Sequence, residues 1–235
     1  MVADNLALLL EACTAAVAEN SPVVVSRYVL QPALYRGRKF DLRFIVALRK
    51  VRPALVSIYD GWLVRTADEE YSVGDYTNLR KHLTVMQYLD ERMGETADRD
   101  WVRKEQLVDN LVASFGPSAD EQHIKMACHN AILECFSLAT SGIHGDADEV
   151  VGIDPTTSHT RVRGCYGVDV MLRPRTDGAC RQECPLEPVI LEVNYKPDLR
   201  RIVREDEEFF EINATSGQLQ FRSDVFTVDP VSGVV

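Results

Sequence analysis

Three oxygen-bearing side chains late in the sequence are candidates for a metal site. Asp169 lies within the apolar run 166–170, where an unpaired carboxylate would be costly. Glu192 and Asn194 alternate with apolar residues, so a β-strand would place them on one face, roughly 6–7 Å apart at Cα. If the two runs pair as a hairpin, Asp169 lies beside Glu192 and Asn194. Carboxylate and amide oxygens without histidine or thiolate favour Mg²⁺, particularly Mg²⁺ that is shared with nucleotide phosphates.

A second group of charged residues lies in the alternating run 39–49. Lys39, Asp41 and Arg43 share one face of the expected strand, and apolar residues form the other. Lysine commonly contacts phosphate, and arginine can clamp a phosphate or carboxylate with two hydrogen bonds. Cations that face a magnesium site suit the handling of ATP phosphates and of an anionic intermediate. Two plainer alternatives remain: Glu192 forms an ordinary buried salt bridge with Arg43, or this face of the strand is solvated.

The rest of the sequence predicts the elements that position these residues. Hydrophobic periodicity and turn residues predict an α+β fold in which helices flank an antiparallel sheet. The expected strands are 22–28, 39–49, 54–59, 62–65, 163–173 and 188–194, with a hairpin turn across Arg52-Pro53. The expected helices are 4–18, 100–114, a long helix after residue 118 and a short helix after Pro197. Loops are expected at 31–37, 66–99 and 143–162, and a hydrophilic insertion at 174–186.

The long helix carries the clearest boundary signals. Ser118 and Glu121 form a predicted capping box, and Gly142 is expected to end the helix. Its apolar face comprises Ile124, Ala127, Cys128, Ala131, Ile132, Cys135, Phe136 and Ala139. Apolar residues at this spacing are typical of an amphipathic helix.

Composition limits the classes of protein to which the chain can belong. Its 235 residues suffice for a hydrophobic core, and we expect one domain over residues 1–235. The net charge of −10 argues against a general nucleic-acid-binding surface. No apolar run approaches the roughly 20 residues of a membrane-spanning helix. The cysteines do not suggest a disulfide framework, and we expect a reducing, cytosolic compartment.

Several motifs in a fixed order resemble the tubulin–tyrosine ligase family, an ATP-grasp amide-ligase family. In order they are Tyr28 with Pro32, Leu34 and Gly37, then Lys39-Phe40-Asp41-Leu42-Arg43, Tyr59, Leu63-Val64-Arg65-Thr66-Ala67, His82-Leu83-Thr84, Tyr166-Gly167-Val168-Asp169, and Leu191-Glu192-Val193-Asn194 with Pro197. Details such as Ser26-Arg27-Tyr28 and Val85-Met86 resemble one divergent branch of the family. The resemblance implies the central and C-terminal ATP-grasp subdomains, and we expect the N-terminal subdomain to be missing from this chain.

The resemblance also implies a role for each matching residue. The implied nucleotide contacts are the adenine hinge Arg27, Tyr28 and Val29, together with Lys39 and Thr84. Arg65 matches the arginine that holds the carboxylate of the incoming amino acid, while Asp41 and Arg43 match a pair that lines the reaction centre. The implied Mg²⁺ ligands are Asp169, Glu192 and Asn194.

The function that the resemblance implies is an ATP- and Mg²⁺-dependent ligase. Such an enzyme adds glutamate or tyrosine, taken as the free amino acid, to tubulin or another acidic protein through an acyl phosphate. It would work in the cytoplasm or on microtubules, with no nucleic acid or membrane partner. Acidic tails would need a basic groove, which Arg36, Arg38, Arg200, Arg201 and Arg204 could supply unless they are simply solvated.

The alternative is a catalytically impaired pseudoenzyme that acts as a nucleotide-, tubulin- or protein-binding module. Most of the family has Gln where Ser26 stands and Asn where Val85 stands, and the side chain of Val85 cannot hydrogen-bond to a nucleotide. The insertion at 174–186 also lengthens the loop between the two strands that carry the expected Mg²⁺ ligands. Ser26, Val85 and the expected absence of the N-terminal subdomain favour the alternative.

Overall fold

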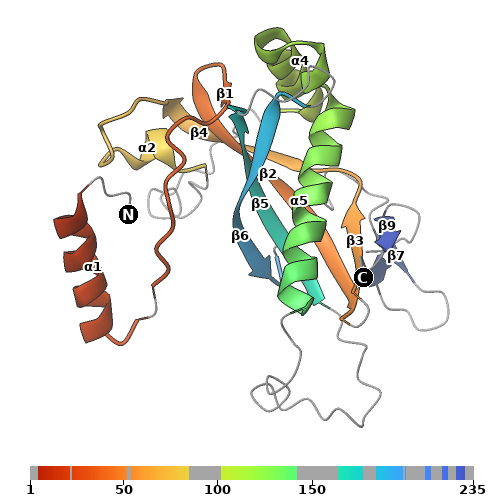
Figure 1. Cartoon of the computed structure of the whole chain (residues 1–235), viewed down its shortest axis with the longest axis horizontal. Coiled ribbons are helices and arrows are strands. Elements are labelled where there is room, and N and C mark those ends of the chain that lie inside the picture. The colour runs from red at the N-terminus through yellow and green to blue at the C-terminus, as the bar shows by residue number, and fades with distance from the viewer. Residues whose placement is uncertain are drawn as a thin grey trace.

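A computed structural model shows a curled antiparallel sheet with helices packed against it (Figure 1). The structure describes residues 5–21, 23–51, 54–84, 102–141, 164–176, 184–197, 199, 210–212, 219–221 and 226–230. The expected α+β class with an antiparallel sheet is therefore confirmed.

The described strands are organised around one long central strand, β2 (Arg38–Lys50). One edge of β2 pairs with β5 (Gly164–Pro174), and the other edge pairs with β4 (Leu63–Glu70) and then β3 (Leu55–Tyr59). Beyond β5 lies β6 (Leu186–Tyr195), and beyond β3 lies β9 (Phe226–Pro230). Each pairing is antiparallel. This order places the strands that carry Asp41, Arg65, Asp169 and Glu192 next to one another.

The alternation of β2 has the predicted consequence. Its apolar face lies in the main core, where Phe40, Leu42, Phe44, Val46 and Leu48 are all buried. At its start, β1 (Leu34–Tyr35) folds back on β2 through Arg36 and Gly37, both with positive φ. A two-residue turn of this kind suits a hairpin, because its twist matches that of the strands. The expected loop at 31–37 is therefore partly a strand.

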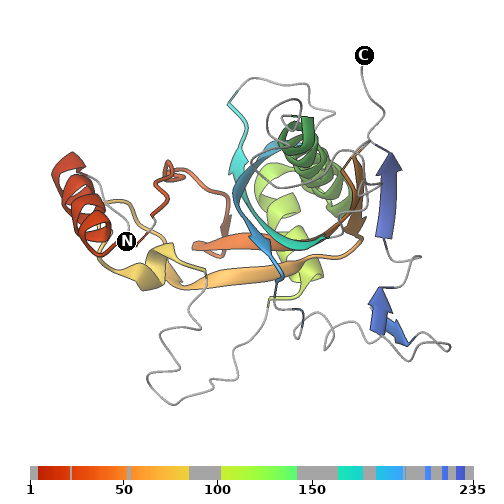
Figure 2. The same cartoon turned by 90° about the horizontal axis from the view of Figure 1, so that it is seen from below.

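Helix α5 (Glu121–Ser141) lies along the concave side of the sheet, which wraps around it in Figure 2. Its buried residues include Ile124, Cys128, Ile132 and Phe136 of the predicted apolar face, whereas Ala139 of that face is exposed. Helix α4 (Lys104–Phe115) and the 3₁₀ turn η1 (Pro117–Ala119) precede it. Helix α5 therefore closes the core over the face of the sheet opposite the charged residues of β2.

The predicted capping box of this helix is wrong. The helix begins at Glu121, because residues 117–119 form a 3₁₀ turn. Asp120 is therefore the residue that caps it, and its Oδ1 accepts a hydrogen bond from the His123 amide at 2.9 Å. An aspartate at this position satisfies an N–H group that the helix itself leaves without a partner. The expected stop at Gly142 lies outside the described residues.

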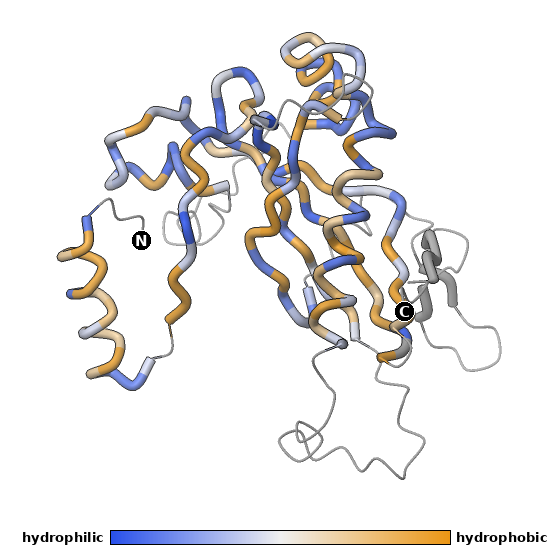
Figure 3. The backbone as a smooth tube through the Cα atoms, in the orientation of Figure 1, coloured by the Kyte–Doolittle hydropathy of each residue, from blue (hydrophilic) through white to orange (hydrophobic). Residues whose placement is uncertain are grey.

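Helix α1 (Leu6–Ala18) forms as predicted but stands away from the sheet (Figures 1 and 2). It buries no residue, although it is strongly apolar (Figure 3). The strand expected at 22–28 is wrong for the described residues 23–28, which run extended without a strand partner, and Val24 is 96% exposed. A valine-rich run becomes a strand only where another strand pairs with it.

The remaining differences lie at the edges of the fold. Strand β4 continues to Glu70, and α2 (Leu79–His82) lies within the region expected to be loop. Strands β7 (Phe210–Ile212) and β8 (Leu219–Phe221) form a separate pair. Several predicted segments lie outside the described residues: the loops at 85–99 and 143–162, and most of the insertion. The short helix expected after Pro197 also lies outside them, apart from Leu199, which is not helical. Within the described part of the chain, no helix is long and apolar enough to span a membrane.

Candidate active site

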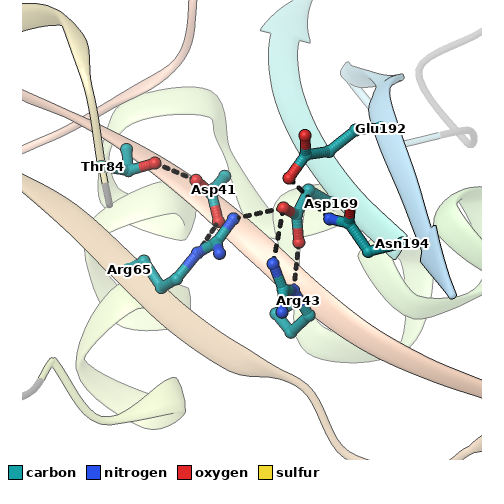
Figure 4. Close-up of polar contacts among 7 residues, drawn as sticks. All are labelled: Asp41, Arg43, Arg65, Thr84, Asp169, Glu192 and Asn194. Atoms are coloured by element: carbon teal, nitrogen blue, oxygen red, sulfur yellow. Dashed lines mark hydrogen bonds and ion pairs between the residues drawn. The ribbon is translucent and has the colours of Figure 1, made fainter. Parts of the chain in front are cut away.

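Asp169 lies at the centre of a charged network on the face of the sheet opposite the core (Figure 4). It faces Arg43 across the β2–β5 pairing and Glu192 across the β5–β6 pairing. The residue is 1% exposed, a position in which a carboxylate needs partners. The register of three neighbouring strands therefore brings these partners to it.

Two arginines bind the Asp169 carboxylate. Arg43 contacts both of its oxygens, through Nε to Oδ1 and through Nη2 to Oδ2 at 2.8 Å. Arg65, from β4, reaches Oδ2 with its Nη2 at 2.7 Å. Two-pronged arginine contacts of this kind fix orientation as well as charge. Both guanidinium groups are largely shielded from solvent, with side-chain exposures of 16% and 14%.

Arg65 links Asp169 to a second buried carboxylate. Its Nε donates to Asp41 Oδ1 at 2.6 Å, as the Asp41–Arg65 register of β2 and β4 allows. The hydroxyl of Thr84 donates to the other oxygen of Asp41. Asp41, Arg65, Asp169 and Arg43 thus form one continuous chain of alternating charge.

The two aspartates respond differently to this environment. Burial raises the pKa of Asp41, and its contacts with Arg65 and Thr84 offset this only in part. Burial also opposes ionisation of Asp169, but Arg43 and Arg65 together hold the pKa of that carboxyl below its usual range. Asp169 is therefore the fixed negative charge at the centre of the network.

Glu192 and Asn194 extend the network toward solvent. The Asn194 amide donates to Glu192 Oε1 at 2.7 Å, and Glu192 is hydrogen-bonded to Asp169 (Figure 4). This contact with Asp169, together with burial, raises the pKa of Glu192. Two carboxylates this close require a shared proton or a cation between them.

These three side chains fit a hard divalent cation. They offer two carboxylates and one amide oxygen from adjacent strands, without a competing thiolate or imidazole. Among the described residues, no three His, Cys, Asp or Glu side chains group together as a metal site, so the set depends on the amide of Asn194. A set with few protein ligands suits Mg²⁺, which usually keeps several waters and binds substrate phosphates.

Lys39 lies on the same face of β2 but outside the ion-pair chain. Its side chain is 2% exposed, and its Nζ lies 4.0 Å from the centre of the Tyr28 ring and 5.2 Å from that of Tyr71. Burial lowers the pKa of Lys39 to about 8, although Asp41 acts in the opposite direction. The ammonium is thus stabilised by aromatic faces, without an ion pair to any carboxylate of the described residues.

Comparison with known proteins identifies the family. The family model described as "Tubulin-tyrosine ligase family" matches residues 1–212. The chain belongs to the tubulin–tyrosine ligase family. It is 30% identical over 200 residues to the human protein named tubulin–tyrosine ligase-like protein 12, a match that covers 82% of this chain and 28% of that protein. The chain thus spans less than a third of the length of that relative.

More distant members of the family also match. A Tetrahymena thermophila protein named tubulin glycylase 3D is 24% identical over 182 residues, or 75% of this chain and 15% of that protein. A protein of the same organism named probable alpha-tubulin polyglutamylase Ttll1 is 34% identical over 82 residues, or 33% of this chain and 20% of that protein. The divergent branch that the sequence details resemble is the one named tubulin–tyrosine ligase-like protein 12.

The structure brings together most of the residues that the family motifs single out. Seven of them meet in Figure 4: Asp41, Arg43, Arg65, Thr84, Asp169, Glu192 and Asn194. Of the expected adenine hinge, Tyr28 contacts Lys39, whereas Arg27 is exposed and Val29 half-buried on the extended segment outside the network. Ser26 is exposed on the same segment, and Val85 lies outside the described residues. The basic groove is untested, since Arg200, Arg201 and Arg204 also lie outside them.

Sequence reasoning missed three features of the family site. It placed Arg43 against Glu192 as an alternative, whereas Arg43 binds Asp169, its neighbour across the β2–β5 pair. It gave no role to Gly167, where an added Cβ would lie 2.9 Å from the Pro197 Cβ and 3.2 Å from the Arg43 Cδ. It also gave no role to His82, which is buried beside Tyr28. Strand register, which no local pattern shows, decides the first two.

Proposed function

We propose that this chain is the magnesium- and phosphate-binding part of an ATP-dependent ligase that joins an amino acid to a carboxylate of tubulin or of another acidic protein. The observation that carries the proposal is that Asp169 contacts both oxygen donors and guanidinium groups. Hard oxygen donors lie on one side, at Glu192 and Asn194, and guanidinium groups lie on the other, at Arg43 and Arg65. The combination suits a reaction that moves a phosphoryl group and gathers carboxylates.

Each part of the site has a role in this proposal. Asp169, Glu192 and Asn194 would hold Mg²⁺, and Lys39 would bind a phosphate. ATP with Mg²⁺, when bound, supplies the phosphoryl group that turns an acceptor carboxylate into an acyl phosphate, from which the amine of the amino acid displaces phosphate. Arg43 and Arg65 orient carboxylates, because their forked donors match a carboxylate in two-pronged fashion. Asp41 holds Arg65 in place.

The nature of the acceptor rests on the relatives. Proteins named as a tubulin glycylase and a probable tubulin polyglutamylase match parts of this chain, which supports tubulin as the acceptor. The amino acid, glutamate or tyrosine, and a cytoplasmic or microtubule location belong to the same proposal. So does the assignment of this sheet to the central and C-terminal subdomains of an ATP-grasp fold.

One observation favours a second candidate, a pseudoenzyme that binds nucleotide or tubulin without transfer. The Nε and Nη2 groups of Arg65 are both engaged by carboxylates of the chain itself, Asp41 and Asp169. A substrate carboxylate would have to share this guanidinium with them or displace one of them.

An incorporation assay separates the two candidates. Tubulin is incubated with the protein, ATP, Mg²⁺ and radiolabelled glutamate, tyrosine or glycine, and labelled tubulin is measured. We expect incorporation by the wild-type protein and none by Glu192→Gln. Binding of Mg²⁺-ATP without incorporation would support the pseudoenzyme, and the absence of both would contradict the proposal.

A further inference from the structure

His82 lies at the centre of a group of rings that we term the aromatic cluster, made up of Tyr28, Tyr71, Tyr76 and His82. Its ring centre lies 5.8 Å from that of Tyr28, 5.8 Å from that of Tyr71 and 5.3 Å from that of Tyr76. Only 3% of its surface is exposed. A buried imidazole needs a partner for each ring nitrogen, and the structure supplies both.

The two hydrogen bonds of His82 define its tautomer. Its Nε2 lies 2.8 Å from the carbonyl oxygen of Asp75, which can only accept, so Nε2 carries the proton. In the neutral ring Nδ1 is then an acceptor, and it lies 2.7 Å from the hydroxyl of Tyr28, which donates to it. His82 therefore ties Tyr28 to the backbone of the 71–78 segment.

Tyr28 in turn determines the surroundings of Lys39. Its ring lies across the Lys39 ammonium at 4.0 Å, closer than the ring of Tyr71 at 5.2 Å. The hydrogen bond to His82 holds the edge of this ring, and so keeps its face on the lysine. Loss of that hydrogen bond would free the Tyr28 ring and leave the Lys39 ammonium with the more distant ring of Tyr71.

The segment that carries Tyr28 depends on such side-chain contacts. Residues 23–33 contain no helix or strand among those described. Besides the Tyr28–His82 bond, the segment is attached by the Tyr71 hydroxyl, which donates to the Leu30 carbonyl at 2.7 Å, and by the Ala33 amide, which donates to the Leu172 carbonyl at 2.8 Å. The side chain of Tyr28 is also hydrogen-bonded to that of Tyr71. Among these attachments, all but that of the Ala33 amide run through the aromatic cluster.

His82 also precedes the contact between Thr84 and Asp41. Helix α2 ends at His82, and two residues later the hydroxyl of Thr84 donates to Asp41. One short segment thus reaches both Tyr28 and Asp41, and both of these residues act on the Lys39 ammonium.

We propose that His82 is a positioning residue: its Nδ1 holds the Tyr28 ring over the Lys39 ammonium and so fixes the 23–33 segment and the lysine in the arrangement that binds nucleotide. The nucleotide part of this inference rests on the proposed function. The positioning part concerns only side chains of this chain and can be tested without any ligand. Preorganisation of this kind improves affinity because less order is lost on binding.

The test compares two substitutions that each keep one half of the imidazole. The amide of His82→Asn lies where Nδ1 does and can still accept from Tyr28, whereas the longer His82→Gln reaches toward the Asp75 carbonyl and leaves Tyr28 without its acceptor. Tyr28→Phe keeps the ring and removes the hydroxyl. The readouts are the NMR signal of the Lys39 ε-methylene, which the nearby ring face shifts upfield, and the affinity for Mg²⁺-ATP.

We expect His82→Gln and Tyr28→Phe each to return the Lys39 signal toward that of an exposed lysine and to weaken Mg²⁺-ATP binding about tenfold, the size of one lost hydrogen bond. His82→Asn should retain most of the upfield shift of the Lys39 signal and most of the affinity for Mg²⁺-ATP. The double variant that combines His82→Gln with Tyr28→Phe should be no worse than either single variant. An unmoved Lys39 signal in Tyr28→Phe, or equal effects of His82→Asn and His82→Gln, would overturn the proposal.

If His82→Gln does not fold, Tyr28→Phe still decides between these outcomes. Should the wild type bind no nucleotide, the proposed function fails while the Lys39 signal still tests the positioning.

Discussion

At the scale of single residues, the site is an arrangement of buried charges that depend on one another. Asp169 accepts from Arg43 and Arg65 at once, and Arg65 also binds Asp41. Removal of one partner therefore leaves the others buried without compensation, which costs more than the pair contributes when intact. The residue types could be inferred from the sequence, but the pairing of Arg43 with Asp169 depends on strand register.

Asp169→Asn tests this dependence. The change leaves two guanidinium groups without their shared carboxylate, and we expect a loss of about 3 kcal/mol in the free energy of unfolding at neutral pH. Because the arginines lower the folded-state pKa of Asp169, its stabilisation is present above its usual pKa and is lost as pH falls through the folded value. Urea unfolding at neutral and acidic pH should show the difference between variant and wild type shrinking in acid. A constant difference would contradict the assignment.

Lys39→Met tests whether burial of the Lys39 ammonium lowers its pKa. Burial lowers the pKa of Lys39 from 10.5 to about 8, so the folded protein carries a disfavoured charge below that pH and sheds it above. The unfolded chain binds the proton between these two values, so the wild type should gain about 1.4 kcal/mol per pH unit relative to the variant there. Tyr28 stays neutral in this window because burial raises its pKa. Unfolding measured from pH 7 to 10 checks this, and a parallel pH dependence of both proteins would refute it.

At the scale of elements, local patterns predicted well and long-range pairing did not. The alternation of β2 and most of the apolar face of α5 were correct because both report burial on one side of a single element, although Ala139 at the end of that face is exposed. The strand expected at 22–28 was wrong because strand formation requires a partner, which the described residues do not provide. The helix cap lies at Asp120 and not at Ser118, because both residue types can cap a helix and the 3₁₀ turn over residues 117–119 decides between them.

Gly167→Ala tests the packing of strand β5 against Pro197 and Arg43. The new methyl group would lie 2.9 Å from Pro197 Cβ and 3.2 Å from Arg43 Cδ, and the rigid proline ring cannot move aside easily. We expect a loss of about 1–3 kcal/mol in the free energy of unfolding from overpacking. Chemical denaturation measures it, and an unchanged midpoint and slope would show that this close approach is not important.

At the scale of the whole molecule, the structure divides into a packed sheet with α4 and α5 and a detached α1. The sheet, α4 and α5 provide the buried core, whereas α1 buries no residue and exposes Leu6, Leu8 and Leu10. Amphipathic periodicity predicted this helix but could not show that it lies apart from the core. Stability should therefore depend on the sheet and not on α1.

A form of the protein that begins at residue 21 tests this division. Its free energy of unfolding should lie within about 0.5 kcal/mol of that of the whole chain, as for changes at exposed sites. The matched control is Ile132→Ala in α5, a fully buried site where we expect a loss of about 2–5 kcal/mol. A large loss on removing α1 would mean that it contributes to the core.

The central claim is that Asp169, Glu192 and Asn194 bind Mg²⁺ together with ATP, and calorimetric titration of ATP with and without Mg²⁺ tests it most directly. The wild-type protein should bind ATP only when Mg²⁺ is present. Glu192→Gln should lose that binding while its thermal unfolding stays close to that of the wild type, because Glu192 lies on the exposed side of the network. ATP binding that is independent of Mg²⁺, unchanged in Glu192→Gln or absent from the wild type would contradict the claim.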